Sequence, residues 1–560
     1  MKTIYLDNNA TTAVAPEVRE AMLPYLTDLY GNPSSMHTFG GQVGRAVEEA
    51  RERMAALLGA HPDEIIFTSC GSESDNAAIW SALQTQPEKR HLITTRVEHP
   101  AILNVAQYWE RQGYRVTLLG VDSKGRLDLD EYAAALSDDT ALVSIMYANN
   151  EVGNVFPISR MAEMAAEKGV LFHTDAVQAV GKEAIDLGRQ PISMLSLSGH
   201  KLHAPKGIGV LYVRKGVRFR PFLRGGHQER GRRAGTENVP YIVGLGMAAQ
   251  LAGQHMQEER TRVARLRDKL EQGLLAAIPD CMVNGDPENR LPNTTNIAFK
   301  NVEGEAILLM LDQLGICASS GSACTSGSLE PSHVLRAMGV PFNYAPGSVR
   351  LSLSRYTTEE EIDFVIENMP LVIKTLRDIS QAFTNRIEPR VVPAIERLET
   401  EGGKAYVKVS FAGDDRPYAC DGRYRIRSAD EDLPVGAALL EQMMLERAAG
   451  RSPWDRRPSG RPIADVDEDT LRAYVERGVE RGRIPFPYID ARDALSRLGL
   501  FCDDDILTNR MLLRLARPHV AHGRAGERRP HADIRQPSGG GHAVRHGQGC
   551  RDVHPEQHAP

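Results

Sequence analysis

An alternation of two sequence patterns over residues 1 to about 385 constrains the fold more than any other feature. Short apolar runs typical of buried strands, such as HLITT, ALVSIMYA, VLFHTDA and GIGVLYV, alternate with amphipathic stretches typical of helices, such as AVEEARERMAALLG and ISRMAEMAAEKG. Apolar strands separated by helices form sheets whose faces those helices cover. The sequence therefore predicts an α/β fold with a largely parallel sheet.

Composition excludes several classes of protein. The chain has 560 residues, of which 42% are hydrophobic and 25% charged, and its formal net charge is −6. This is the balance of a soluble globular protein. At roughly 100 to 200 residues per domain the length allows about three or four domains, which excludes a small disulfide-stapled module. The near-neutral charge argues against a protein that coats nucleic acid.

The sequence also favours a cytoplasmic protein. Its N-terminus, MKTIYLDNNATT, has no apolar run of the secretory kind. No stretch reaches the roughly 18 apolar residues of a membrane helix, so we expect no membrane association. The cysteines are odd in number and form no C-x-x-C pair, which indicates a reducing compartment and individual thiols. They are Cys70, Cys281, Cys317, Cys324, Cys420, Cys502 and Cys550.

The composition changes near residues 386–403, which we interpret as a linker. The last lysine is Lys408, whereas arginines continue to the end of the chain. Residues 404–517 therefore differ in origin from the preceding part, and we expect an additional α+β fragment there. Residues 518–560 hold seven of the 17 histidines and almost no apolar periodicity, and we expect them to be disordered.

Three segments carry residues of chemical interest. In LSLSGHKLHAPKGIGVLYV, burial between two strand-like runs would lower the pKa of Lys201 toward the neutral amine that a Schiff-base lysine needs; a surface hairpin lysine is the alternative. In VLFHTDAVQAVGK, Asp175 ends a strand-like run, where it could pair with a pyridinium nitrogen or simply cap a helix. In FTSCGSESDNAAI, Cys70, Gly71 and Ser72 open a helix whose first N–H groups would form a phosphate cradle.

Together with further motifs, these segments resemble the pyridoxal phosphate enzymes of the aminotransferase class V group, and within it the NifS-type cysteine desulfurases. The motifs are, in order, YLDNNATT, GNPSSMH, TRVEHPAIL, ANNEVGNVFPI, HTDAVQAVGK, LSGHKLHAPKGIGVLY, RGGHQERGRRAGTEN, SSGSACTSGSLEPSHVLRAMG and VRLSLSRYTTEEEID. The resemblance covers residues 1 to about 385. It implies aminotransferase fold type I, with a mostly parallel seven-stranded sheet in a large cofactor-binding domain, residues 16–259. Residues 1–15 and 260–385 would form a small α/β domain.

The resemblance also implies roles for individual residues. Lys201 matches the lysine that holds pyridoxal 5′-phosphate covalently, and His99 matches the histidine that stacks on the cofactor ring and shuttles protons. Asp175 is expected to pair with the pyridine nitrogen. The other cofactor-binding residues would be Gly71, Ser72, Ser198 and His200 at the phosphate, Gln178 and Asn150 near the phenolic oxygen, and Thr236, which would reach the phosphate of the neighbouring subunit in a homodimer.

Two lines of argument select Cys324 as the reactive thiol. It lies in SSGSACTSGS, a run of small polar residues and glycines that predicts a mobile, exposed loop, and it matches the family's catalytic cysteine. Cys70, Cys281 and Cys317 lie beside apolar runs or element ends, and we expect them to be small buried hydrophobes.

One arginine is expected to bind the substrate. Arg350, in VRLSLSRY, matches the arginine that grips the α-carboxylate in a bidentate pair, with Arg355 as the close alternative. Asn150 would be a further substrate contact.

The resemblance implies the reaction as well. L-Cysteine would lose its sulfur to the Cys324 thiolate, which leaves a persulfide on Cys324 and releases L-alanine, while Lys201 or His99 moves the α-proton. The persulfide would supply an iron–sulfur scaffold protein, with at most a transient metal contact at Cys324. The motifs SLEPSHVLRAMG and GGHQERGRRAGTEN look most like the nitrogen-fixation branch. A housekeeping branch and the use of selenocysteine stay open.

Residues 404–517 allow a second hypothesis. They weakly resemble an AlbA-type DNA-binding domain, which would make the chain a DNA-binding regulator whose fused desulfurase-like domain acts as a sensor. A passively attached fragment is the alternative. Nucleic acid would bind only through this segment, and the irregular spacing of the tail histidines is a weak signal for metal.

Overall fold

The computed structural model describes residues 3–320 and 331–388 continuously, with side chains through residue 379. Beyond these it describes residues 394–399, 405–410, 419–420, 423–428, 431–434, 458–462, 466, 468–480, 484, 486–498, 500 and 506–508. The chain divides into two compact units, Met1–Leu440 and Glu441–Pro560, which are described separately below.

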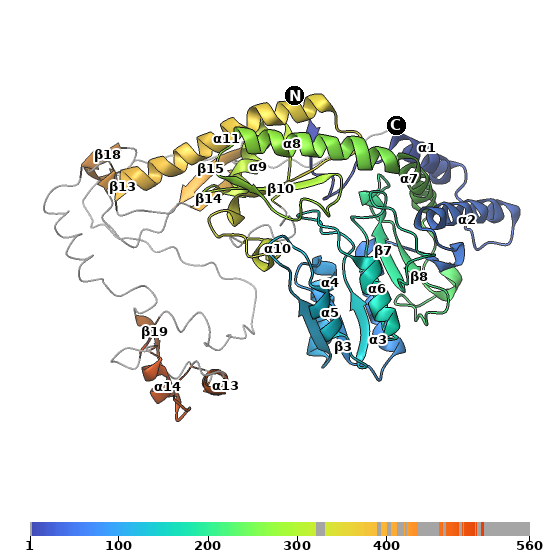
Figure 1. The fold of residues 1–560 in the computed structure, drawn as a ribbon, viewed down its shortest axis with the longest axis horizontal. Helices are drawn as coiled ribbons and strands as arrows, with labels where there is room; N and C mark the ends of the chain where they lie inside the picture. The colour runs from blue at the N-terminus through green and yellow to red at the C-terminus, as the bar shows by residue number, and fades with distance from the viewer. Residues whose placement is uncertain are drawn as a thin grey trace, which may run out of the picture. The chain divides into compact units, whose positions relative to one another are not determined.

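A seven-stranded sheet forms the centre of the first unit (Figure 1). Its strand order is β2-β8-β7-β6-β5-β3-β4. The five strands from β7 to β4 are parallel, whereas β8 runs antiparallel to both of its neighbours. The strands are β2 Ile65–Thr68, β3 His91–Thr95, β4 Arg115–Leu119, β5 Thr140–Ser144, β6 Leu171–Asp175, β7 Met194–Ser198 and β8 Gly209–Val213. The predicted α/β fold with a mostly parallel sheet is confirmed.

Helices cover both faces of this sheet because its strands bury both faces. Alternate residues of a strand point to opposite faces, and in β5 Val143 belongs to one apolar core while Leu142 belongs to another. The covering helices also have the expected apolar stripe: in α6, Ile158, Met161, Ala162 and Ala165 are buried. The helices are α1 Pro16–Thr27, α2 Thr38–Leu58, α3 Gly71–Thr85, α4 Pro100–Arg111, α5 Leu129–Ala135, α6 Ile158–Glu167 and α7 Val239–Glu258.

A second, smaller sheet has an apolar core of its own. It has the order β12-β10-β9, and β1 and β11 form a separate, two-stranded parallel pair. The strands are β1 Ile4–Tyr5, β9 Cys281–Val283, β10 Thr294–Phe299, β11 Ile316–Cys317 and β12 Ser348–Ser352, and the helices are α8 Ala264–Ala277, α9 Gly304–Gln313, α10 His333–Ala337 and α11 Glu359–Arg386. This core combines residues from the N-terminal strand with residues between Val263 and Ile373.

A π-helical turn, η4 Glu259–Val263, joins α7 to α8 without a break in helical backbone. Because α7 packs in the large core and α8 in the small one, a single helical rod connects both cores. The shorter 3-10 turns are η1 Pro62–Glu64, η2 Gly199–Lys201, η3 Gln228–Gly231 and η6 Ala345–Gly347.

The later segments are mainly short antiparallel strands. In the first unit, β13 Ile387–Glu388, β16 Ala419–Cys420, β17 Arg423–Ser428 and β18 Glu431–Pro434 form one sheet, and β14 Ala394–Glu399 pairs with β15 Ala405–Ser410. The second unit holds β19 Pro458–Pro462, β20 Ile506–Thr508 and two helices, α13 Glu468–Glu480 and α14 Ala491–Arg497. Val466, Leu471, Val475 and Leu495 belong to a small core there. The expected disordered tail lies outside the described residues.

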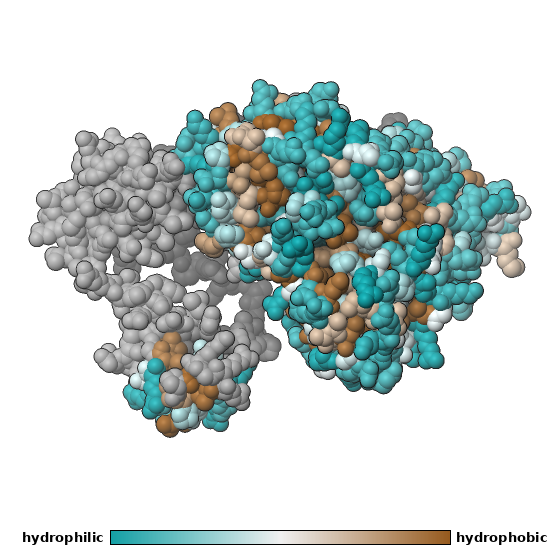
Figure 2. Space-filling model, in the orientation of Figure 1, coloured by the Kyte–Doolittle hydropathy of each residue, from teal (hydrophilic) through white to brown (hydrophobic). Residues whose placement is uncertain are grey.

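The face of the described part that Figure 2 shows is mainly polar. Figure 2 shows hydrophilic residues over most of the visible face, with smaller apolar areas between them. Among the described residues, no helix is long and apolar enough to cross a membrane.

Two glycines of α7 give a test of how closely this helix packs on α2. A Cβ at Gly246 would lie 2.5 Å from Ala50 Cα, whereas a Cβ at Gly253 would have only Leu57 Cδ1 near it, at 3.9 Å. We expect Gly246→Ala to lower the free energy of unfolding by about 1–3 kcal/mol through overpacking. Gly253→Ala should raise it by roughly 0.5–1 kcal/mol, because alanine loses less backbone entropy in a helix.

Urea unfolding followed by circular dichroism measures both variants. Equal effects of the two substitutions would contradict the close approach of α2 and α7.

Candidate functional site

A cavity of about 380 Å³ opens where the parallel strands end. The carboxyl ends of parallel strands meet at one edge of the sheet, which is where α/β folds bind ligands. The cavity is lined by Asn9, Ala10, Cys70, Gly71, Ser72, Asp75, His99, Met146, Ala148, Asn150, Asp175, Val177, Gln178, Ser198, His200, Lys201 and Arg350. The structure therefore brings together the described residues singled out for cofactor and substrate, except Thr236 and the alternative arginine, Arg355.

Lys201 ends the short turn η2, directly after β7. Its Nζ donates hydrogen bonds to the backbone oxygens of Asn9 and Ala10, the latter at 2.6 Å. Burial lowers the pKa of Lys201 to about 7, and the charges of Arg350 and Lys182 add to this effect. A substantial share of Lys201 is therefore a neutral, nucleophilic amine near pH 7. Lys201 is half-buried, and its amine contacts the N-terminal segment, which favours the interpretation of a reactive lysine over that of a surface hairpin lysine.

Asp175 is the last residue of β6, and its side chain is buried. Its Oδ1 accepts a hydrogen bond from Val177 N at 2.9 Å. Burial raises the pKa of Asp175 to about 6, against the lowering effects of that N–H and of the Lys201 charge. Nearby, Gln178 donates from Nε2 to Asn9 O at 3.0 Å, while its Oε1 is buried without a hydrogen-bond partner.

The N-terminus of α3 faces the same cavity. Cys70 occupies the N-cap position and makes no side-chain capping bond, so this helix end has no side chain covering its N–H groups. A Cβ on Gly71 would lie 2.8 Å from Val177 Cγ2, so only glycine allows this close approach. Ser198 lines the cavity as well, and His200 Nδ1 lies 3.1 Å from Thr11 Oγ1. Burial, with the Lys201 charge, lowers the pKa of His200 to about 4, which keeps this ring neutral.

His99 caps the next helix, α4. Its Nδ1 accepts a hydrogen bond from Ala101 N at 3.1 Å. Burial and the charges of Lys201 and His333 lower the pKa of His99. A neutral imidazole that accepts at Nδ1 carries its proton on Nε2, so in this geometry His99 offers the cavity an N–H donor.

The two candidate arginines have different positions. Arg350, on β12, lines the cavity; its Nη2 lies 2.6 Å from Asp7 Oδ1, its Nη1 donates to Asn150 O at 2.9 Å, and its Nε is buried without a partner. Arg355 instead lines a smaller, neighbouring cavity and stacks on Tyr356, with its guanidinium carbon 5.0 Å from the ring centroid. The geometry therefore favours Arg350 over Arg355 as a carboxylate ligand.

Three of the cysteines are less buried than expected. Cys324 lies outside the described residues. Cys70, Cys281 and Cys317 are free and only half-buried, so the expectation that they are small buried hydrophobes is wrong. Burial raises the pKa of the Cys281 and Cys317 thiols, which makes them weak nucleophiles. Cys70 lines the cavity because its N-cap position places it at the start of α3.

The predicted dimer residue Thr236 lies outside the central cavity. Thr236 is exposed and lines a separate cavity of about 160 Å³ together with Arg233 and Glu237.

Among the described residues, no group of three or more His, Cys, Asp or Glu side chains is arranged to hold a metal ion.

Sequence reasoning missed two polar residues of the cavity. Asn9 supplies the carbonyl oxygen that both Lys201 and Gln178 bind. Asp75, one turn into α3, is buried; its Oδ1 has no hydrogen-bond partner and lies 3.7 Å from His173 Nε2. Burial and the neighbouring Asp175 charge raise the pKa of Asp75 well above its usual value, which favours a neutral acid. The only sequence signal was the position of Asp75 one turn after Gly71.

Comparisons with known proteins identify the family. Residues 4–365 match the family described as Aminotransferase class-V. A cysteine desulfurase of Nostoc sp. is 67% identical over 380 residues, which are 68% of this chain and 95% of that protein. The cysteine desulfurase NifS of Azotobacter vinelandii is 63% identical over 381 residues, again 68% of this chain and 95% of that protein.

A solved structure shares the fold as well. It is described as a NifS-like protein, is 39% identical, and superposes with a TM-score of 0.63 over 67% of this chain and 100% of that chain. Identity and coverage at these levels lead to one conclusion, and a half-buried lysine shares one cavity with a buried carboxylate and a buried arginine. The chain belongs to the aminotransferase class-V family and, within it, to the cysteine desulfurases.

Proposed function

We propose that the chain uses pyridoxal 5′-phosphate to convert L-cysteine into L-alanine, while the sulfur passes to Cys324 as a persulfide. One observation carries this proposal: Lys201, whose burial lowers its pKa to about 7, shares a cavity with the buried carboxyl group of Asp175 and with Arg350. The named activity of the relatives in Nostoc sp. and Azotobacter vinelandii supports it. The matches concern enzymes over residues 4–365 and give no support to a DNA-binding regulator.

The residues of the cavity fit this cofactor. The uncapped N-terminus of α3 at Gly71 and Ser72, where a Cβ would clash with Val177, suits a phosphate group. Asp175 would take the ring nitrogen, and Lys201 would bind the aldehyde carbon. When bound, the cofactor supplies an electron sink that makes the α-proton of an amino acid removable.

The proton steps fall to Lys201 and His99. The Lys201 Nζ, neutral in part near pH 7, would accept the α-proton of the substrate. His99, with its proton on Nε2, would donate a hydrogen bond inside the cavity rather than take a proton at that atom. The neutral His200 would act at the phosphate as a hydrogen-bonding ring and not as a cation.

Arg350 would orient the substrate. Asp7 and Asn150 O occupy its two terminal nitrogens, and its buried Nε is left without a partner. A substrate carboxylate that accepts from Nε and one terminal nitrogen forms a bidentate pair, which fixes the α-carbon relative to Lys201.

The sulfur step would need a thiolate at Cys324. The thiolate attacks the sulfur atom of the substrate; an S–S bond forms, the C–S bond breaks, its electron pair stays with the carbon, and protonation completes L-alanine. The persulfide then supplies an iron–sulfur scaffold protein, in the manner of the nitrogen-fixation or the housekeeping branch. We further propose a cytoplasmic homodimer in which Thr236, exposed in one subunit, completes the phosphate site of the other.

Lys201 is tested by chemical fixation of the cofactor. Lys201→Ala removes the one lysine amine among the described residues that line the cavity, so borohydride reduction should leave no cofactor attached after denaturation. The wild-type chain should keep one equivalent on the peptide that contains Lys201. Mass spectrometry of the digest measures both. Lys206→Ala, at an exposed lysine of the same hairpin, is the control and should behave like the wild type. Attachment in the Lys201→Ala chain would overturn the assignment.

Cys324 is tested by separating cofactor binding from sulfur transfer. Cys324→Ala should keep the yellow absorbance of the bound cofactor but lower alanine release from L-cysteine by roughly 100-fold or more, since the sulfur acceptor of a covalent mechanism is gone. Cys281→Ala, at a half-buried thiol of β9, should leave the rate unchanged. Alanine release at the wild-type rate by the Cys324→Ala chain would refute the role.

Arg350 and Arg355 are distinguished by kinetics. Arg350→Lys should raise KM for L-cysteine by roughly 10- to 100-fold, because a lysine cannot form the bidentate pair. Arg355→Lys should change KM much less, since Arg355 lies outside the substrate cavity. Steady-state rates at several L-cysteine concentrations provide both values, and a larger effect at Arg355 would reverse the choice.

A further inference from the structure

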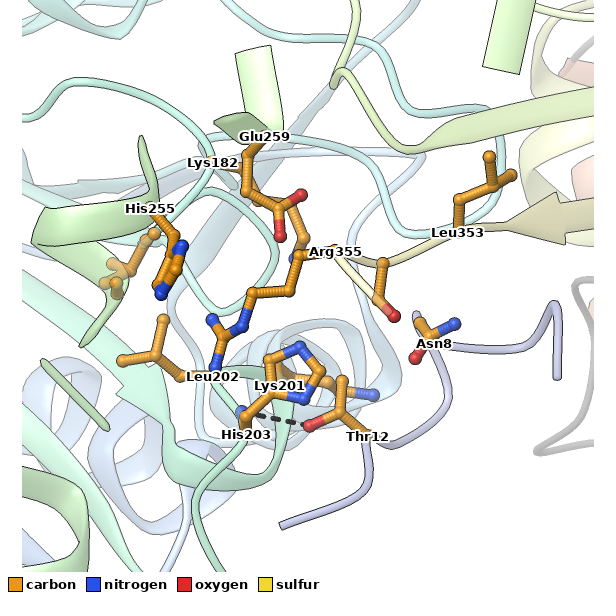
Figure 3. A pocket seen from close by; sticks show the side chains of 14 residues that line it. Asn8, Thr12, Lys182, Lys201, Leu202, His203, His255, Glu259, Leu353 and Arg355 are labelled. Atoms are coloured by element: carbon orange, nitrogen blue, oxygen red, sulfur yellow. Dashed lines mark hydrogen bonds between the residues drawn. The ribbon is translucent and has the colours of Figure 1, made fainter. Parts of the chain in front are cut away.

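A second, smaller cavity lies next to Lys201 (Figure 3). Its volume of about 20 Å³ is enough for one water molecule. Besides Lys201 it is lined by five ionisable side chains, namely Lys182, His203, His255, Glu259 and Arg355. None of these five was needed for the cofactor, the substrate or the sulfur step.

Lys182 is the most deeply buried lysine of this group, with 8% of its surface exposed. Its Nζ donates a hydrogen bond to the backbone oxygen of Gln178 at 3.1 Å. Burial lowers the pKa of Lys182 to about 8, and the charge of Glu259 acts in the opposite direction. A buried ammonium group is costly unless an anion and hydrogen bonds compensate it, and for Lys182 the Glu259 charge and the Gln178 backbone oxygen supply part of that compensation.

Glu259 begins the π-helical turn η4 between α7 and α8. It is buried, its Oε2 has no hydrogen-bond partner in the protein, and Figure 3 shows its carboxylate turned toward the middle of the cavity. Burial raises the pKa of Glu259, whereas the charges of Lys182 and Arg355 lower it. A single water in the cavity would satisfy Oε2 and link it to the Lys182 ammonium.

Hydrogen bonds also connect Lys182 to the proposed cofactor lysine. Lys182 holds the backbone of Gln178, the side chain of Gln178 donates to Asn9 O, and the same oxygen accepts from Lys201 Nζ. The charges that act on Lys201 are those of Arg350 and Lys182, which disfavour its ammonium form, and those of Asp7 and Asp175, which favour it. Burial and the charge of Lys201 also lower the pKa values of the neighbouring His99 and His200 rings.

We propose that Lys182 is a positioning residue for the reaction: as a second buried cation it keeps the Lys201 amine neutral, it holds the Gln178 turn, and Glu259 is its counter-ion through one ordered water. This inference rests on the proposed function, because it takes Lys201 as the amine that binds the cofactor. A neighbouring cation and a desolvated pocket both disfavour the ammonium form of a lysine, so more of it is present as the nucleophilic amine.

The test measures the Lys201 amine directly. Full-length protein, freed of bound cofactor with hydroxylamine and dialysed, is labelled with trace acetic anhydride at a series of pH values, and mass spectrometry of the peptide that contains Lys201 gives its pKa. Removal of a nearby positive charge makes protonation easier, so Lys182→Met should raise this pKa from about 7 by about one unit. The pH midpoint of pyridoxal phosphate uptake should move in the same direction. Lys168→Met, at the exposed end of α6, controls for a general charge effect and should shift neither value.

Glu259→Gln tests the counter-ion. Without the anion Lys182 should lose its proton near neutral pH, so the Lys201 pKa should again rise, by less than in Lys182→Met, and the double variant should match Lys182→Met alone. If Lys182→Met does not fold, Lys182→Gln removes the same charge with a side chain that keeps a donor for Gln178 O.

Two results would overturn the inference: a Lys201 pKa that stays within about 0.3 unit in the folded charge-removing variant, or one that falls in Glu259→Gln. Alanine formation by the wild-type protein is measured in the same preparations. If the wild type takes up cofactor but forms no alanine, the proposed function fails, while the pKa comparison still decides the role of Lys182.

Discussion

The structure of the site depends on the burial of ionisable groups at the carboxyl edge of the large sheet. Asp175 and Asp75 are buried there and Lys201 is half-buried, and desolvation is the largest cause of the pKa change of each. Desolvation penalises the charged form of every group, so amines move toward neutrality and carboxyl groups toward their acid forms. Desolvation of these groups lowers the stability of the fold. It also makes the edge reactive, because proton transfer is easiest between groups whose pKa values lie near the working pH.

The N-terminal segment completes this environment from outside the large sheet. Strand β1 pairs with β11 of the small core. The residues that follow β1, Asn9 and Ala10, accept hydrogen bonds from Lys201 Nζ at their carbonyl oxygens. Asp7 reaches Arg350 on β12. A short stretch of chain therefore links the small core to both the lysine and the arginine of the site, which explains why the cavity takes residues from positions as distant as 9 and 350.

The sequence predicted the architecture because buried parallel strands have a local signature: Leu142 and Val143 lie in one unbroken apolar run, and the helix that follows carries its stripe at regular spacing. Lys201, Asp175 and Gly71 were found from their places at strand and helix ends, supported by a family resemblance. Asn9 and Asp75 were not, since one acts through a backbone oxygen and the other through its distance from a carboxyl group that is 100 positions away in sequence. Cys70 was misjudged because apolar neighbours in sequence do not fix which side of a helix start faces a cavity.

The unbroken helical connection from α7 through η4 to α8 has a mechanical consequence. A rod shared by two cores transmits rotation, so a change in the angle between those cores must be absorbed where the rod is weakest, in a π-turn whose backbone hydrogen bonds depart from the regular helical pattern. Glu259 is the first residue of that turn. Bending of the rod would move the Glu259 carboxylate relative to Lys182. A movement between the two cores would then change the electric field at the Lys201 amine, even without a bound ligand.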